Sequence, residues 1–276
     1  MQPVSTEQGF VLQDRPRRDI ALVTLNRPER MNSMAFDVMV PLKRVFEELR
    51  NDNSARVVVL TGAGRGFSSG ADHKSAGAVP NVDGLTRPTY ALRSMELLDD
   101  VILALRRLHQ PVIAAVNGAA IGGGLCLALA ADIRVAAFGA YFRAAGINNG
   151  LTASELGLSY LLPRAIGSSR AFEIMLTGRD VDAEEAERIG LVSCQVPDDD
   201  LLEVCYDMAE RIAAFSRPGV ELTKRTLWSG LDAASLEAHM QAEGLGQLYV
   251  RLLTDNFEEA VAARAEKRPA VFRDDK

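Results

Sequence analysis

Asn117-Gly118-Ala119-Ala120-Ile121-Gly122-Gly123-Gly124-Leu125-Cys126 joins an apolar run to an alanine-rich segment with the composition of a helix. Glycines at such a junction let backbone N–H groups turn toward a ligand, because no Cβ obstructs the approach. At the start of a helix these groups lack partners and lie at the positive end of the helix dipole. The stretch therefore predicts a site for an oxygen that becomes negative during a reaction.

A second glycine-rich loop, Gly62–Asp72, follows the apolar run Val57–Leu60. Parallel strands that end at the same edge of a sheet place their following loops side by side. One N–H group from each loop could then converge on one oxygen, although a tight turn is an equally good interpretation of either loop alone. Neither loop ends in Gly-Lys-Ser/Thr, which excludes a P-loop, and the spacing of the glycines fits a dinucleotide fingerprint poorly.

The rest of the chain alternates strand and helix patterns up to about residue 168 and is mainly helical beyond it. This order predicts an α/β protein, and we expect a core at residues 1–200 and a helical region at residues 201–276. We expect strands at 10–14, 20–25, 57–60, 112–116 and 133–136, with a turn at 15–19 after the first. We expect inward-facing apolar residues on one long helix at Leu92, Met95, Leu98, Ile102, Leu105 and Leu108.

Composition excludes several classes of function. The 276 residues carry a net charge of −6 with a pI near 5.3, which argues against a nucleic-acid binder. No apolar run is long enough to span a membrane, and the first ten residues lack the apolar core of a signal peptide. The three cysteines have no metal or disulfide spacing, and three scattered histidines make a metal site improbable. A cytoplasmic protein without metal is the simplest expectation.

Two motifs resemble a known family. Phe67-Ser68-Ser69-Gly70-Ala71-Asp72 resembles one motif of the crotonase, or enoyl-CoA hydratase/isomerase, superfamily, and Val116–Gly118 with Ile121–Gly124 resembles another. Further similar segments follow in the family's order: Leu25–Pro28, Met31–Ser33, Ala131–Arg134, Leu162–Gly167, Leu176–Arg179, Ala186–Val192 and Glu266–Phe272. The resemblance implies a crotonase-like spiral of repeated β-β-α units with a C-terminal helical oligomerisation region, assembled as a homotrimer or a dimer of trimers.

The resemblance also implies a substrate, an acyl-CoA thioester, and no cofactor apart from the coenzyme A within it. The thioester oxygen would accept hydrogen bonds from the backbone N–H groups of Ala71 and Gly123. Each such donor typically contributes about 3–4 kcal/mol to transition-state stabilisation. The residues expected to bind the substrate are Arg27, Gly70, Asp72, Lys74, Gly118, Gly122, Asn148 and Lys267. For the cations among them a solvated surface charge is at least an equally good interpretation, and for Asn148 a turn is the better one.

The acid/base residues are where this sequence departs from the pattern of the family's hydratases. Hydratases of the family use two glutamates, and the matching positions here are Cys126 and, by the simplest register, Gly146. Gly150–Glu155 resembles the segment that carries the catalytic acid of the family's isomerases, so Glu155 is the expected acid/base. The alternative for Glu155 is an acid at a helix start, and a buried packing residue is the favoured interpretation of Cys126.

These expectations favour an enoyl-CoA isomerase/hydratase type of enzyme that stabilises a thioester enolate and uses one carboxylate. A rival within the same class is a hydratase of fatty-acid β-oxidation type, using Glu155 and a water oriented by an asparagine. A rival of another class is a non-catalytic acyl-CoA-binding protein, which the missing glutamates make reasonable.

Overall fold

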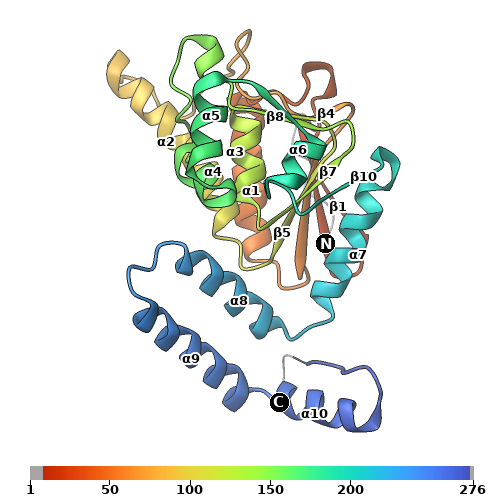
Figure 1. Ribbon diagram of the computed structural model, residues 1–276. Helices are drawn as coiled ribbons and strands as arrows, with labels where there is room; N and C mark the ends of the chain where they lie inside the picture. Colours follow the sequence, from red (N-terminus) through yellow and green to blue (C-terminus); the bar gives the residue numbers. More distant parts are fainter. Residues whose placement is uncertain (1–8, 274–276) are drawn as a thin grey trace.

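A computed structural model describes residues 9–273 and contains two sheets (Figure 1). The larger sheet has the strand order β1-β2-β3-β5-β7-β10, in which β1 and β2 are antiparallel and the other neighbours are parallel. Its strands are β1 (Val11–Arg17), β2 (Ile20–Leu25), β3 (Val57–Gly62), β5 (Val112–Val116), β7 (Ile133–Ala137) and β10 (Cys194–Val196). Every residue of β3 and β5 is buried, as expected for strands covered on both faces.

The smaller sheet has four strands of three residues each, in the order β4-β6-β8-β9. They are β4 (Gly66–Ser68), β6 (Ala119–Ile121), β8 (Tyr141–Arg143) and β9 (Asp180–Asp182). The first three are parallel, and β9 is antiparallel to β8. Each of β4, β6 and β8 directly follows a strand of the larger sheet in the chain, so the glycine loops run from one sheet to the other.

The order of elements repeats a β-β-α unit, as the family resemblance implied. The three units are β3-β4-α2, β5-β6-α3 and β7-β8-α4. The helices of this part are α1 (Phe36–Arg50), α2 (Arg87–Arg106), α3 (Gly123–Ala130), α4 (Leu158–Ile166), α5 (Ser168–Thr177) and α6 (Ala183–Arg188). Short 3₁₀ turns lie at Pro28–Arg30, Ile147–Asn149 and Asp198–Asp200. All eight residues of α3 are buried, which places the glycine-rich start of this helix at the centre of the molecule.

The last four helices differ in how they contact the sheets. α7 (Leu201–Ala213) still packs on the larger sheet, and Leu201, Cys205 and Ala209 belong to its core. α8 (Arg217–Gly230), α9 (Leu236–Leu253) and α10 (Asn256–Glu266) extend beyond this body, with α9 packed against α8 and α10 (Figure 1). The division of the chain at residue 200 stays a prediction. Between residues 9 and 273, no helix combines the length and the apolar character that crossing a membrane requires.

Three expectations from the sequence need correction. β1 continues to Arg17, where a turn was expected at 15–19, because an edge strand tolerates Pro16, which cannot donate a hydrogen bond. The strands of the smaller sheet were not predicted, because a strand of three residues is too short to show an alternating pattern. Leu92 and Met95 are exposed, whereas Ile102 and Leu105 are buried, because only the second half of α2 covers the core.

The expectation that the chain has no signal peptide depends mainly on residues 1–8, and these lie outside the described residues.

Candidate active site

The backbone around Ala71 leaves its N–H group without a partner. Met34 N–H donates to Gly70 O at 2.7 Å, and Asp72 N–H donates to Met34 O at 3.3 Å. Because successive peptide groups of an extended chain point to opposite sides, the Ala71 N–H points away from Met34. It has no acceptor among residues 9–273, and Ala71 is exposed. This N–H group is therefore available to a ligand.

The Gly123 N–H group lies beside this loop. Gly123 is the first residue of α3, so its N–H has no acceptor within the helix, and none occurs elsewhere in the described part of the chain. Gly70 has φ +77°, and a Cβ built on it would lie 2.6 Å from Ile121 O and 3.4 Å from Gly123 N. Only glycine permits this approach, which brings the loops of Ala71 and Gly123 into backbone contact.

Glu155 lies beside Gly122, in the turn of glycines 122–124 that begins α3 (the glycine turn). A Cβ built on Gly122 would lie 3.1 Å from Glu155 Oε1, so the carboxylate is next to the residue that precedes Gly123. Glu155 is half-buried, and this burial raises the pKa of its carboxyl, while the charge of His73 acts in the opposite direction. A carboxyl with a raised pKa is suited to accepting and returning a proton near neutral pH.

Cys126 supports the Glu155 segment from inside the core. Its thiol is fully buried and donates a hydrogen bond of 3.5 Å to the backbone O of Glu155. Burial, and then the charge of Glu155, raise the pKa of the thiol well above its usual value. The group is therefore a neutral thiol at physiological pH and not a nucleophile, in agreement with the packing interpretation.

Gly146, the other position matched to a hydratase glutamate, has no room for a side chain. A Cβ built there would lie 2.0 Å from Thr152 O and 3.1 Å from the Cα of Ala153. The loop that leads to Glu155 thus packs backbone to backbone on Gly146. Within the described residues, Glu155 is the carboxylate that the structure places at the glycine turn.

Asp72 anchors the loop that carries Ala71. Burial alone would raise the pKa of its carboxyl, but hydrogen bonds from the N–H groups of Ser75 and Lys74, and from Arg30 and Ser33, hold it well below the usual range. Arg27 NH1 lies 3.1 Å from Asp72 Oδ2 and is buried with it. Asp72 and Arg27 thus face each other inside the protein.

Comparisons with known proteins show which family the chain belongs to. The sequence profile described as enoyl-CoA hydratase/isomerase matches residues 15–275. The chain belongs to the enoyl-CoA hydratase/isomerase family. It is 84% identical over 267 residues to the probable enoyl-CoA hydratase EchA12 of Mycobacterium bovis, covering 97% of this chain and 94% of that protein. As a member of this family, the chain is an acyl-CoA-processing enzyme with the crotonase fold.

Two solved structures are similar over most of the enzyme. A probable enoyl-CoA hydratase/isomerase from Mycobacterium abscessus has 74% sequence identity and a TM-score of 0.93, covering 97% of this chain and all of that one. A monofunctional enoyl-CoA isomerase from M. smegmatis also has 74% identity, with a TM-score of 0.72 over 84% of this chain and 98% of that one. The relatives thus carry both names, hydratase and isomerase.

The remaining expected substrate-binding residues of this family member are Lys74, Gly118, Asn148 and Lys267. Lys74 and Lys267 are exposed, and Lys267 ends α10 in a left-handed conformation. The amide of Asn148 is close to Gly178, since a Cβ built on Gly178 would lie 2.5 Å from Asn148 Oδ1. A Cβ on Gly118 would lie 2.3 Å from Arg65 O, so this glycine lets the two loops meet. Their roles in binding the substrate stay predictions.

Two further residues of the enzyme line the glycine turn and escaped the sequence analysis. A Cβ built on Gly123 would lie 2.5 Å from Met34 Sδ and 3.3 Å from Leu156 Cδ1. Both side chains are largely buried and form apolar walls beside the Gly123 N–H group. Leu156 has φ +46°, a conformation that is costly for leucine and turns the chain directly after Glu155. Neither residue belongs to a glycine motif, so only the folded chain identifies them.

Proposed function

We propose that the enzyme is an enoyl-CoA isomerase that moves a double bond between the 3 and 2 positions of an acyl-CoA thioester. The observation that carries this proposal is that Glu155 is the one carboxylate of residues 9–273 found beside the glycine turn, with a neutral thiol at Cys126 and no side-chain room at Gly146. One carboxylate is sufficient for a proton to be taken from one carbon and returned to another.

In this reaction Glu155 removes a proton from C2 of the 3-enoyl thioester. The electron pair moves onto the thioester oxygen, which accepts hydrogen bonds from the N–H groups of Ala71 and Gly123. The protonated Glu155 then gives the proton to C4 of the dienolate, and the double bond ends between C2 and C3. The carboxylate is regenerated, and no oxidant, reductant or cofactor is consumed.

Hydration of a 2-enoyl thioester is the second candidate, since close relatives are named probable hydratases. Addition of water needs a group that orients and activates the water as well as a proton donor. The two positions matched to hydratase glutamates do not supply a second carboxylate. The proposal therefore ranks isomerisation above hydration.

The test uses purified protein with crotonyl-CoA and with a 3-enoyl-CoA, and the Glu155→Gln variant as control. We expect the conjugated thioester absorbance to appear from the 3-enoyl substrate, and the Gln variant to be slower by about 10²–10⁴-fold. A rapid loss of absorbance from crotonyl-CoA would instead show a hydratase. Tight binding of both thioesters with no turnover would show a protein that only binds acyl-CoA.

The proposal also covers the binding of coenzyme A, the assembly of the chain and its compartment. The exposed Lys74 and Lys267 would contact the phosphates of coenzyme A, and no cofactor is needed besides the CoA of the substrate. The apolar residues on α8–α10 would pack against other copies of the chain in a homotrimer or a dimer of trimers. Cys126, Cys194 and Cys205 are free thiols, which fits a reducing cytoplasm.

A further inference from the structure

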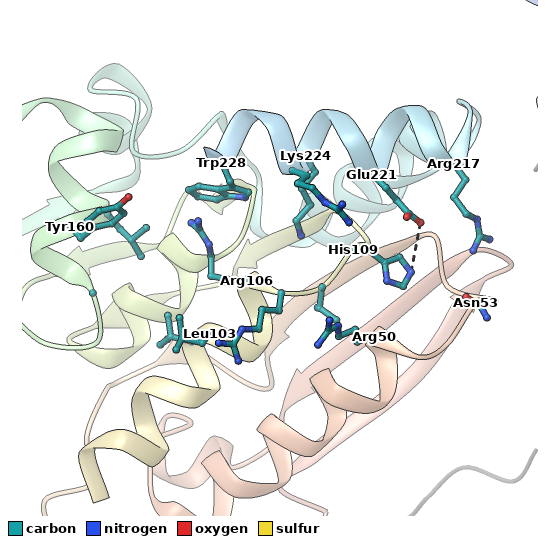
Figure 2. Close-up of a pocket in the computed structure, with 16 residues that line it drawn as sticks. Arg50, Asn53, Leu103, Arg106, His109, Tyr160, Arg217, Glu221, Lys224 and Trp228 are labelled. Carbon is teal, nitrogen blue, oxygen red and sulfur yellow. Dashed lines mark ion pairs between the residues drawn. The ribbon is translucent and has the colours of Figure 1, made fainter. Parts of the chain in front are cut away.

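A cleft of about 820 Å³ lies between the core and α8, at the C-terminal ends of α1 and α2 (Figure 2). Arg50 and Asn53 border it from α1 and the turn after it, and Leu103 and Arg106 from α2. α8 forms the opposite wall, from Arg217 to Trp228, and Tyr160 of α4 closes one end. The cleft belongs to neither glycine loop and contains no residue assigned to the reaction.

The charge on this cleft is opposite to that of the whole protein. The chain has a net charge of −6, yet the cleft has one acidic residue, Glu221, in its lining. Its basic residues are Arg50, Arg106, Arg107, Arg217, Lys224 and Arg225. Concentrated positive charge with partly apolar walls raises the local concentration of anions.

Three of the six basic residues are not paired with carboxylates of the described residues. Lys224 is paired, because its Nζ lies 2.8 Å from Asp132 Oδ2 and donates to Gln110 O at 2.8 Å. Glu221 is directed to His109, with Oε1 3.7 Å from Nε2. Arg50, Arg107 and Arg225 form no ion pair with any described residue. Their donors are therefore free to bind an anion.

The guanidinium of Arg106 is held in a fixed position in the cleft. Its guanidinium stacks on the ring of Trp228, 3.1 Å from the centroid, which fixes the plane of the group. Its NH1 atom is buried and has no hydrogen-bond partner among residues 9–273. Burying a guanidinium donor without an acceptor is costly, so an acceptor supplied by a ligand would offset that cost. A planar guanidinium prefers carboxylate and phosphate oxygens.

We propose that this cleft is a binding site for an anion that carries phosphate or carboxylate, with one such group held by Arg106. Arg50, Arg107 and Arg225 surround the remaining charge, and Leu103, Tyr160 and Trp228 provide apolar surface for the body of the ligand. The site is separate from the oxyanion-binding N–H groups of Ala71 and Gly123 and does not depend on the isomerase proposal.

The cleft nevertheless adjoins the chain segment that holds Glu155. Gly157 lies in its lining, two residues after Glu155, and α4 with Tyr160 follows directly. The same anion chemistry therefore has two possible sources: a free metabolite, or an acidic group at the far end of the acyl chain of a substrate. The experiment below separates them.

Binding is measured by titration calorimetry with inorganic pyrophosphate at physiological ionic strength. We expect one site per chain in the unaltered protein, and affinity about tenfold or more weaker in Arg106→Gln. The double variant Arg50→Gln/Arg107→Gln changes only exposed side chains and should weaken binding without affecting the fold. Arg170→Gln, which removes an exposed arginine of α5 outside the cleft, should bind like the unaltered protein.

The source of the anion is found by competition. Saturated thioesters from adipoyl-CoA to dodecanedioyl-CoA are compared with their methyl-ended partners as competitors of pyrophosphate. Displacement by the carboxylate-ended thioesters alone would assign the cleft to the distal acid of the substrate. No displacement by either series would assign it to a free anion. Both results support the site.

Three results would overturn the proposal. The first is no heat of binding at millimolar pyrophosphate. The second is equal affinity in the unaltered protein, Arg106→Gln and Arg50→Gln/Arg107→Gln. The third is displacement by methyl-ended thioesters, which would place pyrophosphate in the pocket for the CoA phosphates. None of these readouts uses turnover, so they are independent of the test of Glu155→Gln.

Discussion

At the scale of single residues, the chemistry depends on which groups surround the glycine turn. Cys126 fills a position matched to a hydratase glutamate with a buried neutral thiol that contacts the backbone of Glu155. In the proposed reaction Glu155 then carries the proton-transfer role alone. Partial burial raises the pKa of its carboxyl, which makes the carboxylate a stronger base toward the substrate proton.

The pKa of Glu155 leads to a prediction about stability. Burial raises it from the ordinary value of 4.5, so folding favours the protonated carboxyl. Its contribution to stability is complete below the unfolded pKa and is lost as pH rises through the folded pKa. We expect Glu155→Gln to raise the free energy of unfolding at pH 7 and to have little effect at about pH 4, by urea denaturation. A variant that is less stable than the parent at pH 7 would contradict this.

At the scale of elements, the close contact between the loops that follow β4 and β6 fixes the position of the Gly123 N–H group. Gly70→Ala places a Cβ 2.6 Å from Ile121 O in a backbone with φ +77°. Left-handed strain costs about 1–3 kcal/mol, and the forced contact about 1–3 kcal/mol more. We expect a large fall in unfolding free energy and in kcat, because the Gly123 N–H group is displaced.

Gly84→Ala is the matched control for this substitution. Gly84 has φ +76°, but a Cβ there would have no atom within 4 Å. Thermal unfolding and turnover of both variants separate strain from contact. If Gly84→Ala lost as much stability as Gly70→Ala, the loop contact would not matter.

The attachment of α8 to the core is a second property of elements. Lys224 is buried against Asp132, which also accepts hydrogen bonds from Trp228 Nε1 at 2.5 Å and from Val112 N–H at 2.7 Å. Removing one partner of a buried pair typically costs about 3–5 kcal/mol. We therefore expect Lys224→Met to lower the free energy of unfolding by about 3 kcal/mol in urea.

Lys43→Met provides the comparison for Lys224→Met. Lys43 Nζ lies 2.7 Å from Asp100 Oδ2 in a partly exposed pair between α1 and α2. Exposed pairs contribute about 0–1 kcal/mol, so this variant should be nearly as stable as the parent. Equal losses in the two variants would mean that the Lys224 pair does not fix α8.

At the scale of the whole molecule, the C-terminal helices present more apolar surface than a monomer normally exposes. Leu236, Leu245 and Leu252 of α9 are 76%, 70% and 66% exposed. α9 and α10 extend away from the two sheets (Figure 1), and these side chains stay mostly exposed in the described chain. Such a surface is typical of a contact with other subunits.

We expect the 29.9 kDa chain to elute as a trimer or a multiple of it in size exclusion with light scattering. Leu245→Glu/Leu252→Glu should reduce the mass toward one chain, since a charged group would be buried in the contact. The control is Phe138→Glu, which alters a side chain that is 57% exposed and lies outside the C-terminal helices. This variant should leave the mass unchanged. A parent protein that is monomeric at micromolar concentration would contradict the proposed assembly.

The sequence by itself predicted the α/β class, the long strands and most helices, because their apolar runs are long enough to show a period. It also singled out Ala71, Gly123 and Glu155, because the glycines and their spacing resemble a family. The sequence also predicted that the two glycine loops lie side by side. The tertiary structure showed which contacts hold them together, with Ala71 paired to Met34 and Gly70 packed on Ile121. It also placed Met34, Leu156 and the cationic cleft at Arg106. These features arise from contacts between residues far apart in the chain, which no local pattern records.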